Sequence, residues 1–130
     1  MQVNKLTLKN FRNHIDKTFN FSEGLTVING PNGIGKTNIL ESLYVIATGR
    51  SQRARYDKEM INYDTTFCSI SANTLSTEYE YLLEVQVIAT DSTTNLSTKR
   101  AKVNKVNKTM QHLIGLFNAV LFSPQDIDLV

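Results

Sequence analysis

A glycine-rich segment at residues 30–37 limits the fold of this chain more than any other feature does. Its sequence, GPNGIGKT, fits the pattern G-x-x-x-x-G-K-[ST], in which the backbone N–H groups of a loop surround a phosphate chain. An apolar run at residues 25–28 precedes it and predicts a buried strand, and an apolar-periodic run at residues 39–46 follows it and predicts a helix. Strand, loop and helix in this order bring the positive end of a helix dipole to the same phosphate. The segment therefore predicts an α/β fold with a site for a phosphate-bearing ligand.

The residues of this segment have separate expected roles. Lys36 is expected to reach the β- and γ-phosphates of a nucleotide, the Thr37 hydroxyl to bind Mg²⁺, and Asn38 to lie close to the α-phosphate. The other loop residues are expected to contact the nucleotide mainly through the backbone; they are Gly30, Pro31, Asn32, Gly33, Ile34 and Gly35. A glycine turn that matches by chance is the alternative, and the signals on both flanks disfavour it.

Length and composition exclude several classes of protein. The 130 residues make at most one domain, and a net charge of +2 is too small to require a nucleic-acid partner. No apolar run approaches the ~18 residues of a membrane span, and the N-terminus lacks a signal-peptide pattern, so the expected compartment is the cytoplasm. Cys68 is the single cysteine, which excludes an internal disulfide and a thiolate metal site and predicts a packing role.

Alternating apolar residues and turn signals predict a mostly β structure around this helix. Strands are expected at residues 3–9, 15–21, 67–75, 78–89 and 97–103, with shorter strand candidates at 105–108 and 119–122. Residues 50–64 are expected to form a loop with a helical turn, and residues 109–115 a weak helix. In the helix after the glycine loop, the spacing predicts that Leu40 lies on the apolar face, that Glu41 is exposed, and that Gly49 is the C-terminal cap.

The last residues of the chain have the marks of a helix start. Ser123 is a candidate N-cap, Pro124 takes the first helical position, and Asp126 completes a capping box. Because the sequence ends at Val130, just after this start, we expect a truncated chain.

Several segments resemble one known family. Residues 9–14, KNFRNH, and residues 24–43, GLTVINGPNGIGKTNILESL, resemble the N-terminal ATPase lobe of the SMC-like ABC ATPases. Within that group the RecF family is the most similar. Residues 49–55 match it with Gln52 in place of an aromatic residue, residues 103–108 with Lys108 where glycine is common, and residues 121–130 with Gln125 in place of glutamate. The resemblance covers the whole chain. It implies one partial domain at residues 1–130, an α/β P-loop ATPase lobe I with an antiparallel hairpin sheet, truncated before the helical lobe.

The resemblance also implies a function for the parent protein. Members of the family bind ATP and Mg²⁺, dimerise through their ATPase heads, and act on DNA at junctions or gaps together with recombination mediator proteins, in replication, recombination, repair and the SOS response. The Walker B and signature motifs of such ATPases are not found in this sequence. Without the Walker B acid no residue is placed to activate water, so this chain alone is expected not to be a competent ATPase.

The resemblance assigns roles to residues outside the glycine loop as well. Arg12 would lie near the nucleotide phosphates, and Gln125, in the Q-loop position, would act with Lys36 in catalysis and reach the Mg²⁺. A surface cation and an exposed helix residue are the respective alternatives. The basic cluster of Arg50, Arg53 and Arg55, and a looser one at residues 99–108, could contact DNA phosphates or be solvated faces.

Three other functions stay open from the sequence. The first is the head of another SMC-like ATPase, which the sequence beyond Val130 would decide. The second is a non-catalytic remnant that binds nucleotide weakly or binds only partners. The third is an unrelated P-loop kinase or GTPase, for which the chain shows no acceptor or base-specific motif.

Overall fold

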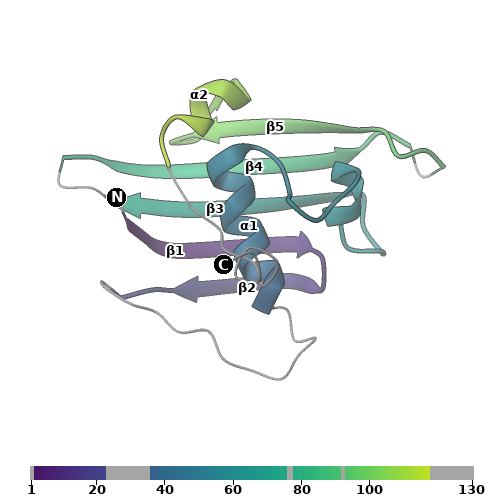
Figure 1. Ribbon diagram of the computed structural model, residues 1–130, viewed down its shortest axis with the longest axis horizontal. Helices are drawn as coiled ribbons and strands as arrows, with labels where there is room; N and C mark the ends of the chain where they lie inside the picture. Colours follow the sequence, from purple (N-terminus) through teal and green to yellow (C-terminus); the bar gives the residue numbers. More distant parts are fainter. Residues whose placement is uncertain (1, 23–35, 76–77, 92, 118–130) are drawn as a thin grey trace, which may run out of the picture.

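The computed structural model describes residues 2–22, 36–75, 78–91 and 93–117. In this part of the chain six strands form one antiparallel sheet in the order β2-β1-β3-β4-β5-β6 (Figure 1). The strands are β1 (Gln2–Phe11), β2 (His14–Asn20), β3 (Phe67–Leu75), β4 (Glu80–Ala89), β5 (Ser97–Val103) and β6 (Val106–Lys108). The helical elements are α1 (Lys36–Thr48), the 3-10 helix η1 (Asp57–Met60) and α2 (Met110–Ile114). None of these helices is long and apolar enough to cross a membrane.

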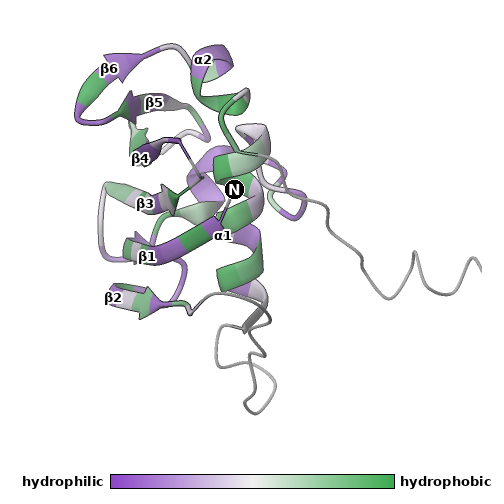
Figure 2. Ribbon diagram, turned by 90° about the vertical axis from the view of Figure 1, so that its left-hand side faces the viewer, coloured by the Kyte–Doolittle hydropathy of each residue, from purple (hydrophilic) through white to green (hydrophobic). Residues whose placement is uncertain are grey.

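The core lies between the sheet and α1, which crosses one face of the sheet (Figure 2). The strand registers align buried side chains into two rows that run across β1, β3, β4 and β5. The first row is Leu6, Ala72, Leu83 and Val103, and the second is Leu8, Ile70, Val85 and Ala101. Because side chains alternate between the two faces of a strand, the residues between these rows lie on the opposite face, where Thr7, Ser71, Glu84 and Lys102 form a polar row.

The six predicted strands that fall within the described residues are confirmed, and their ends move by up to two residues. The first strand extends two residues past its predicted end, to Phe11, and the turn follows at Arg12 and Asn13. Residues 50–64 contain η1 as the predicted helical turn. The weak helix is α2, whose N-cap Thr109 accepts a hydrogen bond from the His112 N–H at 3.2 Å.

The predicted helix α1 is confirmed, and Ile39, Ile46 and Ala47 bury its apolar face, but Leu40 and Glu41 lie differently from the prediction. Gly49 ends it with a φ of +81°, and its N–H donates to the Val45 carbonyl at 2.7 Å, as a C-terminal cap should. Leu40, expected on the apolar face, is 45% exposed. Glu41, expected to be exposed, is fully buried, so that prediction is wrong. The physical reason is that Glu41 has ionic partners from outside the helix, and the spacing of apolar residues within the helix does not reveal them.

Further observations concern single side chains. Cys68 on β3 is buried, which confirms its packing role. Tyr81 packs against the core, whereas Tyr79 is exposed and stacks on Tyr81 with ring centroids 6.0 Å apart. The strand expected at 25–28, the glycine loop at 30–35, and residues 119–130 with Gln125 lie outside the described residues.

Candidate functional site

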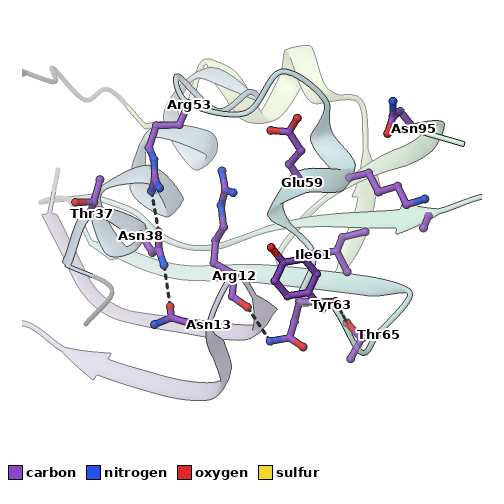
Figure 3. A pocket seen from close by; sticks show the side chains of 13 residues that line it. Arg12, Asn13, Thr37, Asn38, Arg53, Glu59, Ile61, Tyr63, Thr65 and Asn95 are labelled. Carbon is purple, nitrogen blue, oxygen red and sulfur yellow. Dashed lines mark hydrogen bonds between the residues drawn. The ribbon is translucent and has the colours of Figure 1, made fainter. Parts of the chain in front are cut away.

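An open cleft of about 1040 Å³ lies where the β1–β2 turn, the start of α1 and the segment after η1 meet. Arg12, Asn13, Thr37, Asn38 and Arg53 line one part of it. The other part is lined by Lys58, Glu59, Ile61, Asn62, Tyr63, Thr65, Ala89 and Asn95. Figure 3 shows Arg12 between Thr37 and Arg53 on one side and Tyr63 and Thr65 on the other. The cleft therefore joins segments that are far apart in the sequence.

The turn that carries Arg12 is held by bonds to the segment at residues 60–62. Asn10 and Arg12 have φ values of 52° and 53°, a left-handed conformation that costs a non-glycine residue about 1–2 kcal/mol. The Arg12 N–H donates to the Met60 carbonyl, the Asn62 N–H donates to the Asn10 carbonyl, and the Asn62 side-chain amide donates to the Arg12 carbonyl, each at 2.8 Å. These three bonds fix the backbone from which the Arg12 side chain extends.

The guanidinium of Arg12 forms a two-pronged pair with Glu41. Its Nε donates to Glu41 Oε1 at 3.0 Å and its Nη2 to Glu41 Oε2 at 2.8 Å. The Arg12 side chain is 21% exposed and the Glu41 side chain 0%. The hydrogen bond to Glu41 raises the pKa of Arg12 above its usual value and outweighs the opposing effect of burial. Arg12 is therefore a fixed cation at the edge of the cleft.

Two residues of the loop after α1 reach the same carboxylate. The Ser51 hydroxyl donates to Glu41 Oε2, and Arg53 Nη1 lies 3.4 Å from Glu41 Oε1. Arg53 Nη1 also donates to Asn38 Oδ1 at 2.7 Å, and Asn38 Nδ2 donates to Asn13 Oδ1 at 2.8 Å. A continuous polar chain thus links the β1–β2 turn, the first turn of α1 and the loop after α1.

The structure brings together part of the predicted nucleotide site. Arg12, Thr37 and Asn38 all line the cleft, and Thr37 is exposed in the first turn of α1, while their contacts with a nucleotide stay a prediction. The Asn38 side chain bonds to protein groups on both sides. The loop residues 30–35, the side chain of Lys36 and Gln125 lie outside what the structure describes.

The basic cluster expected to contact DNA separates into two parts. Arg53 lines the cleft, whereas Arg50 and Arg55 are exposed and do not line it, and Arg55 lies 5.6 Å from the ring centroid of Tyr56. In the looser cluster, the Lys99 ammonium bonds to the Gly49 carbonyl at 2.5 Å and to Asp57 at 3.2 Å. A role for these residues at DNA stays a prediction.

The sequence reasoning missed Glu41 and Ser51, which have no part in the glycine-loop pattern. One signal could have found Glu41: residues four apart share a helix face, and Thr37 must face a ligand. Glu41 therefore belongs to the ligand face of α1 rather than to its solvent face. Ser51 carried no comparable signal, because its bond depends on how the loop after Gly49 folds back.

Comparison with known proteins identifies the family of the chain. The chain matches the family model described as AAA domain over residues 5–125. The DNA replication and repair proteins RecF of Acetivibrio thermocellus and Natranaerobius thermophilus are 37% and 35% identical to it, over 98% and 100% of this chain. The chain spans about a third of the length of these relatives, 33% in both.

Solved structures give the same result. A structure of the recombination mediator protein RecF with ATP in the RecFOR pathway has a TM-score of 0.85 and 29% identity, over 98% of this chain and 34% of its own. The SMC head domain from Thermotoga maritima has a TM-score of 0.72 over 90% of this chain and 42% of its own, and at 19% identity it supports the fold alone. The α/β ATPase-lobe fold predicted from the sequence is thereby confirmed. The chain therefore belongs to the AAA domain family, and it is a homologue of RecF proteins over about a third of their length.

Proposed function

We propose that this chain binds ATP in the cleft, as part of an ATPase that acts in DNA recombination, repair and replication. The observation that carries the proposal is the position of Thr37, at the start of the helix that follows the glycine loop, in one cleft with Arg12 and Arg53. The cleft volume of about 1040 Å³ is large enough for a nucleotide. The similarity to a RecF structure with ATP supports the same ligand.

The charges around the cleft favour an anionic ligand. Among the described lining residues, Arg12, Arg53 and Lys58 are basic and only Glu59 is acidic. The N-terminus of α1 adds partial positive charge next to Thr37. At the other end, Ile61 and Tyr63 offer apolar and aromatic surface that suits a nucleobase.

A divalent cation would depend on the ligand as much as on the protein. Among the described residues, no three His, Cys, Asp or Glu side chains gather into a metal site. Mg²⁺ prefers six oxygen ligands and usually keeps several waters, so the Thr37 hydroxyl and phosphate oxygens would complete its shell. Such an ion would partly neutralise the phosphate chain, and Arg12 and the N-terminus of α1 would orient that chain.

The test is an isothermal titration of the protein with Mg-ATP, and then of its Lys36→Ala variant. We expect the variant to keep its fold and to lose at least about tenfold in affinity, because the lysine of such a loop is a charged phosphate contact. Lys17→Gln removes one positive charge from the exposed part of β2 and is the matched control. Unchanged affinity in Lys36→Ala would show that the glycine loop is not the phosphate site.

The wider functions belong to this proposal as well. The relatives are named as DNA replication and repair proteins, and one neighbour as a recombination mediator, so we propose DNA, a second ATPase head and mediator proteins as partners of the whole protein. For this chain alone we expect weak DNA binding that falls as salt rises and does not depend on ATP, because phosphate contacts dominate such binding. Fluorescence anisotropy at low and raised salt, with and without Mg-ATP, measures both properties. Tight binding that persists at high salt would contradict the expectation.

Hydrolysis by this chain alone is expected to be negligible, because preorganised charge at the γ-phosphate is usually the largest catalytic contribution and half of it is not encoded here. Sustained phosphate release that Lys36→Ala abolishes would contradict that expectation.

The cytoplasmic location stays a prediction from the sequence.

A further inference from the structure

The buried carboxylate of Glu41 sits at the centre of the polar network beside the cleft. It has no exposed surface, and it accepts hydrogen bonds from Arg12, Ser51 and Arg53. Burying a charge costs several kcal/mol unless partners compensate for it, and these three partners supply that compensation. Glu41 follows Thr37 by one helical turn, which places it on the helix face that meets the cleft.

Glu41 fixes how Arg12 and Arg53 are presented. It occupies the Nε and one Nη2 hydrogen of Arg12, and a guanidinium has five N–H donors, so other donors remain for a ligand. Arg53 reaches Glu41 with Nη1 alone, and its side chain is 40% exposed. Two guanidinium groups repel each other, and a carboxylate bonded to both offsets that repulsion. Both arginines line the same cleft.

The backbone that carries Arg53 depends on the same carboxylate. Ser51 donates to Glu41, and its oxygen accepts hydrogen bonds from the backbone N–H groups of Arg53 and Ala54, each at 2.9 Å. The turn at residues 51–54 is therefore organised around a side chain that Glu41 anchors. If the carboxylate were lost, Arg53 would lose its direct partner and the anchor of its loop together.

We propose that Arg53 is a second phosphate-binding arginine of the cleft, and that Glu41 is the positioning residue that holds Arg12 and Arg53 as a pair. The ligand class is the phosphate chain of a nucleotide, which matches the planar fork of a guanidinium. The inference deepens the proposed ATP site and rests on it. It also separates Arg53 from Arg50 and Arg55, which do not line the cleft.

The experiment compares three probes in competition with a fluorescent ATP analogue: ATP, inorganic tripolyphosphate and adenosine. The variants are Arg53→Gln, Arg53→Lys, Ser51→Ala and Glu41→Gln, with Lys17→Gln as the control for charge. We expect Arg53→Gln to weaken the binding of ATP and of tripolyphosphate by the same factor, about tenfold, because a charged hydrogen bond is lost. The affinity for adenosine should not change. Arg53→Lys should recover only part of the loss, because lysine lacks the fork.

The two positioning variants should show the same pattern without touching the ligand. Glu41→Gln keeps the shape of the side chain and removes its charge. The affinity for ATP and tripolyphosphate should therefore fall by about tenfold or more, while the affinity for adenosine should not change. Ser51→Ala leaves the Arg12–Glu41 pair in place and should weaken the same two probes about threefold through Arg53 alone. Thermal unfolding of every variant checks the fold, and Ser51→Ala carries the positioning test if Glu41→Gln does not fold.

The roles of Arg53 and of Glu41 can be refuted separately. Wild-type affinity of Arg53→Gln for ATP and tripolyphosphate would overturn the role of Arg53. Equal weakening of ATP and adenosine by Glu41→Gln or Ser51→Ala would show that the network supports only the fold, and would overturn the positioning role. If Lys36→Ala binds ATP like the wild type, the proposed ATP site fails, while tripolyphosphate still reports on the arginine pair.

Discussion

Removing the guanidinium of Arg12 should destabilise the fold by about 3 kcal/mol. The Arg12→Met variant leaves the Glu41 carboxylate fully buried, with the Ser51 hydroxyl and with Arg53 Nη1 at 3.4 Å as its remaining partners. Breaking a buried ion pair from one side typically costs about 3–5 kcal/mol, because a charge is left without compensation. The remaining partners, and the 21% exposure of Arg12 itself, place the expected loss at the lower end of that range.

The reverse substitution should cost less, and the double substitution least. In Glu41→Met the charge left behind is on Arg12, whose partly exposed side chain can turn toward water, so about 1–2 kcal/mol is expected. In Arg12→Met/Glu41→Met no buried charge remains, and apolar replacement of such a pair is often neutral within about 1 kcal/mol. The predicted order of stability is therefore wild type and double variant first, then Glu41→Met, then Arg12→Met.

Urea denaturation followed by far-ultraviolet circular dichroism measures this order. For a domain of this size a loss of about 3 kcal/mol corresponds to a fall in Tm of roughly 10 °C. Lys17→Met, on the exposed part of β2, is the control and should stay within about 0.5 kcal/mol of the wild type. A loss below about 1 kcal/mol in Arg12→Met would refute the view that Arg12 is the main compensating charge. A double variant as unstable as Arg12→Met would refute the electrostatic origin of the loss.

Three further predictions test other parts of the fold. Burial raises the pKa of Cys68 to about 12, so a disulfide reagent should label the native thiol at about pH 8 roughly a thousandfold more slowly than the unfolded chain. Because the pKa of Cys68 is higher in the folded than in the unfolded state, the thiol's contribution to the free energy of unfolding is complete below about pH 8.5 and is lost as pH rises toward 12. Urea titrations across this range should show a fall in the free energy of unfolding that Cys68→Ala removes. Gly49→Ala should cost about 1–2 kcal/mol in the same assay, because φ is +81° and the new Cβ would lie 3.0 Å from Ile114 Cδ1, so an unchanged midpoint would contradict the cap. Thr109→Ala should cost about 1 kcal/mol by removing the N-cap of α2, whereas Thr109→Ser should cost little.

Local signals explain why most of the elements could be predicted. The alternation in β4 and the glycine after α1 act within a few residues, and the structure confirms both. The order of the sheet could not be predicted in the same way. β1 pairs with β3 across more than 50 residues of sequence, and no local pattern in either strand specifies that neighbour.

The candidate site could be predicted only where a pattern carries chemistry. The glycine-loop pattern identified Thr37, and the family resemblance identified Arg12, which lies in the same cleft. Glu41 was misplaced because its burial is set by Arg12, 29 residues earlier in the chain, and by Ser51 and Arg53 in the loop after the helix. The spacing of apolar residues predicts which face of a helix is buried, but it cannot show that a charged side chain is compensated by residues from other segments.

The energetics of the pair bear on why such a network is present in this fold. A buried Arg12–Glu41 pair adds little stability over two apolar side chains, so stability alone does not account for it. What apolar side chains cannot supply is a pair of oriented cations in a cleft that also holds the start of the phosphate-loop helix. The Arg12→Met/Glu41→Met variant separates the two properties in one molecule. It should unfold at nearly the same urea concentration as the wild type and bind ATP and tripolyphosphate at least about tenfold more weakly. The reason is that Arg12 is replaced and Arg53 loses the carboxylate that positions it. If it folds well and keeps full affinity, the network is not part of the phosphate site.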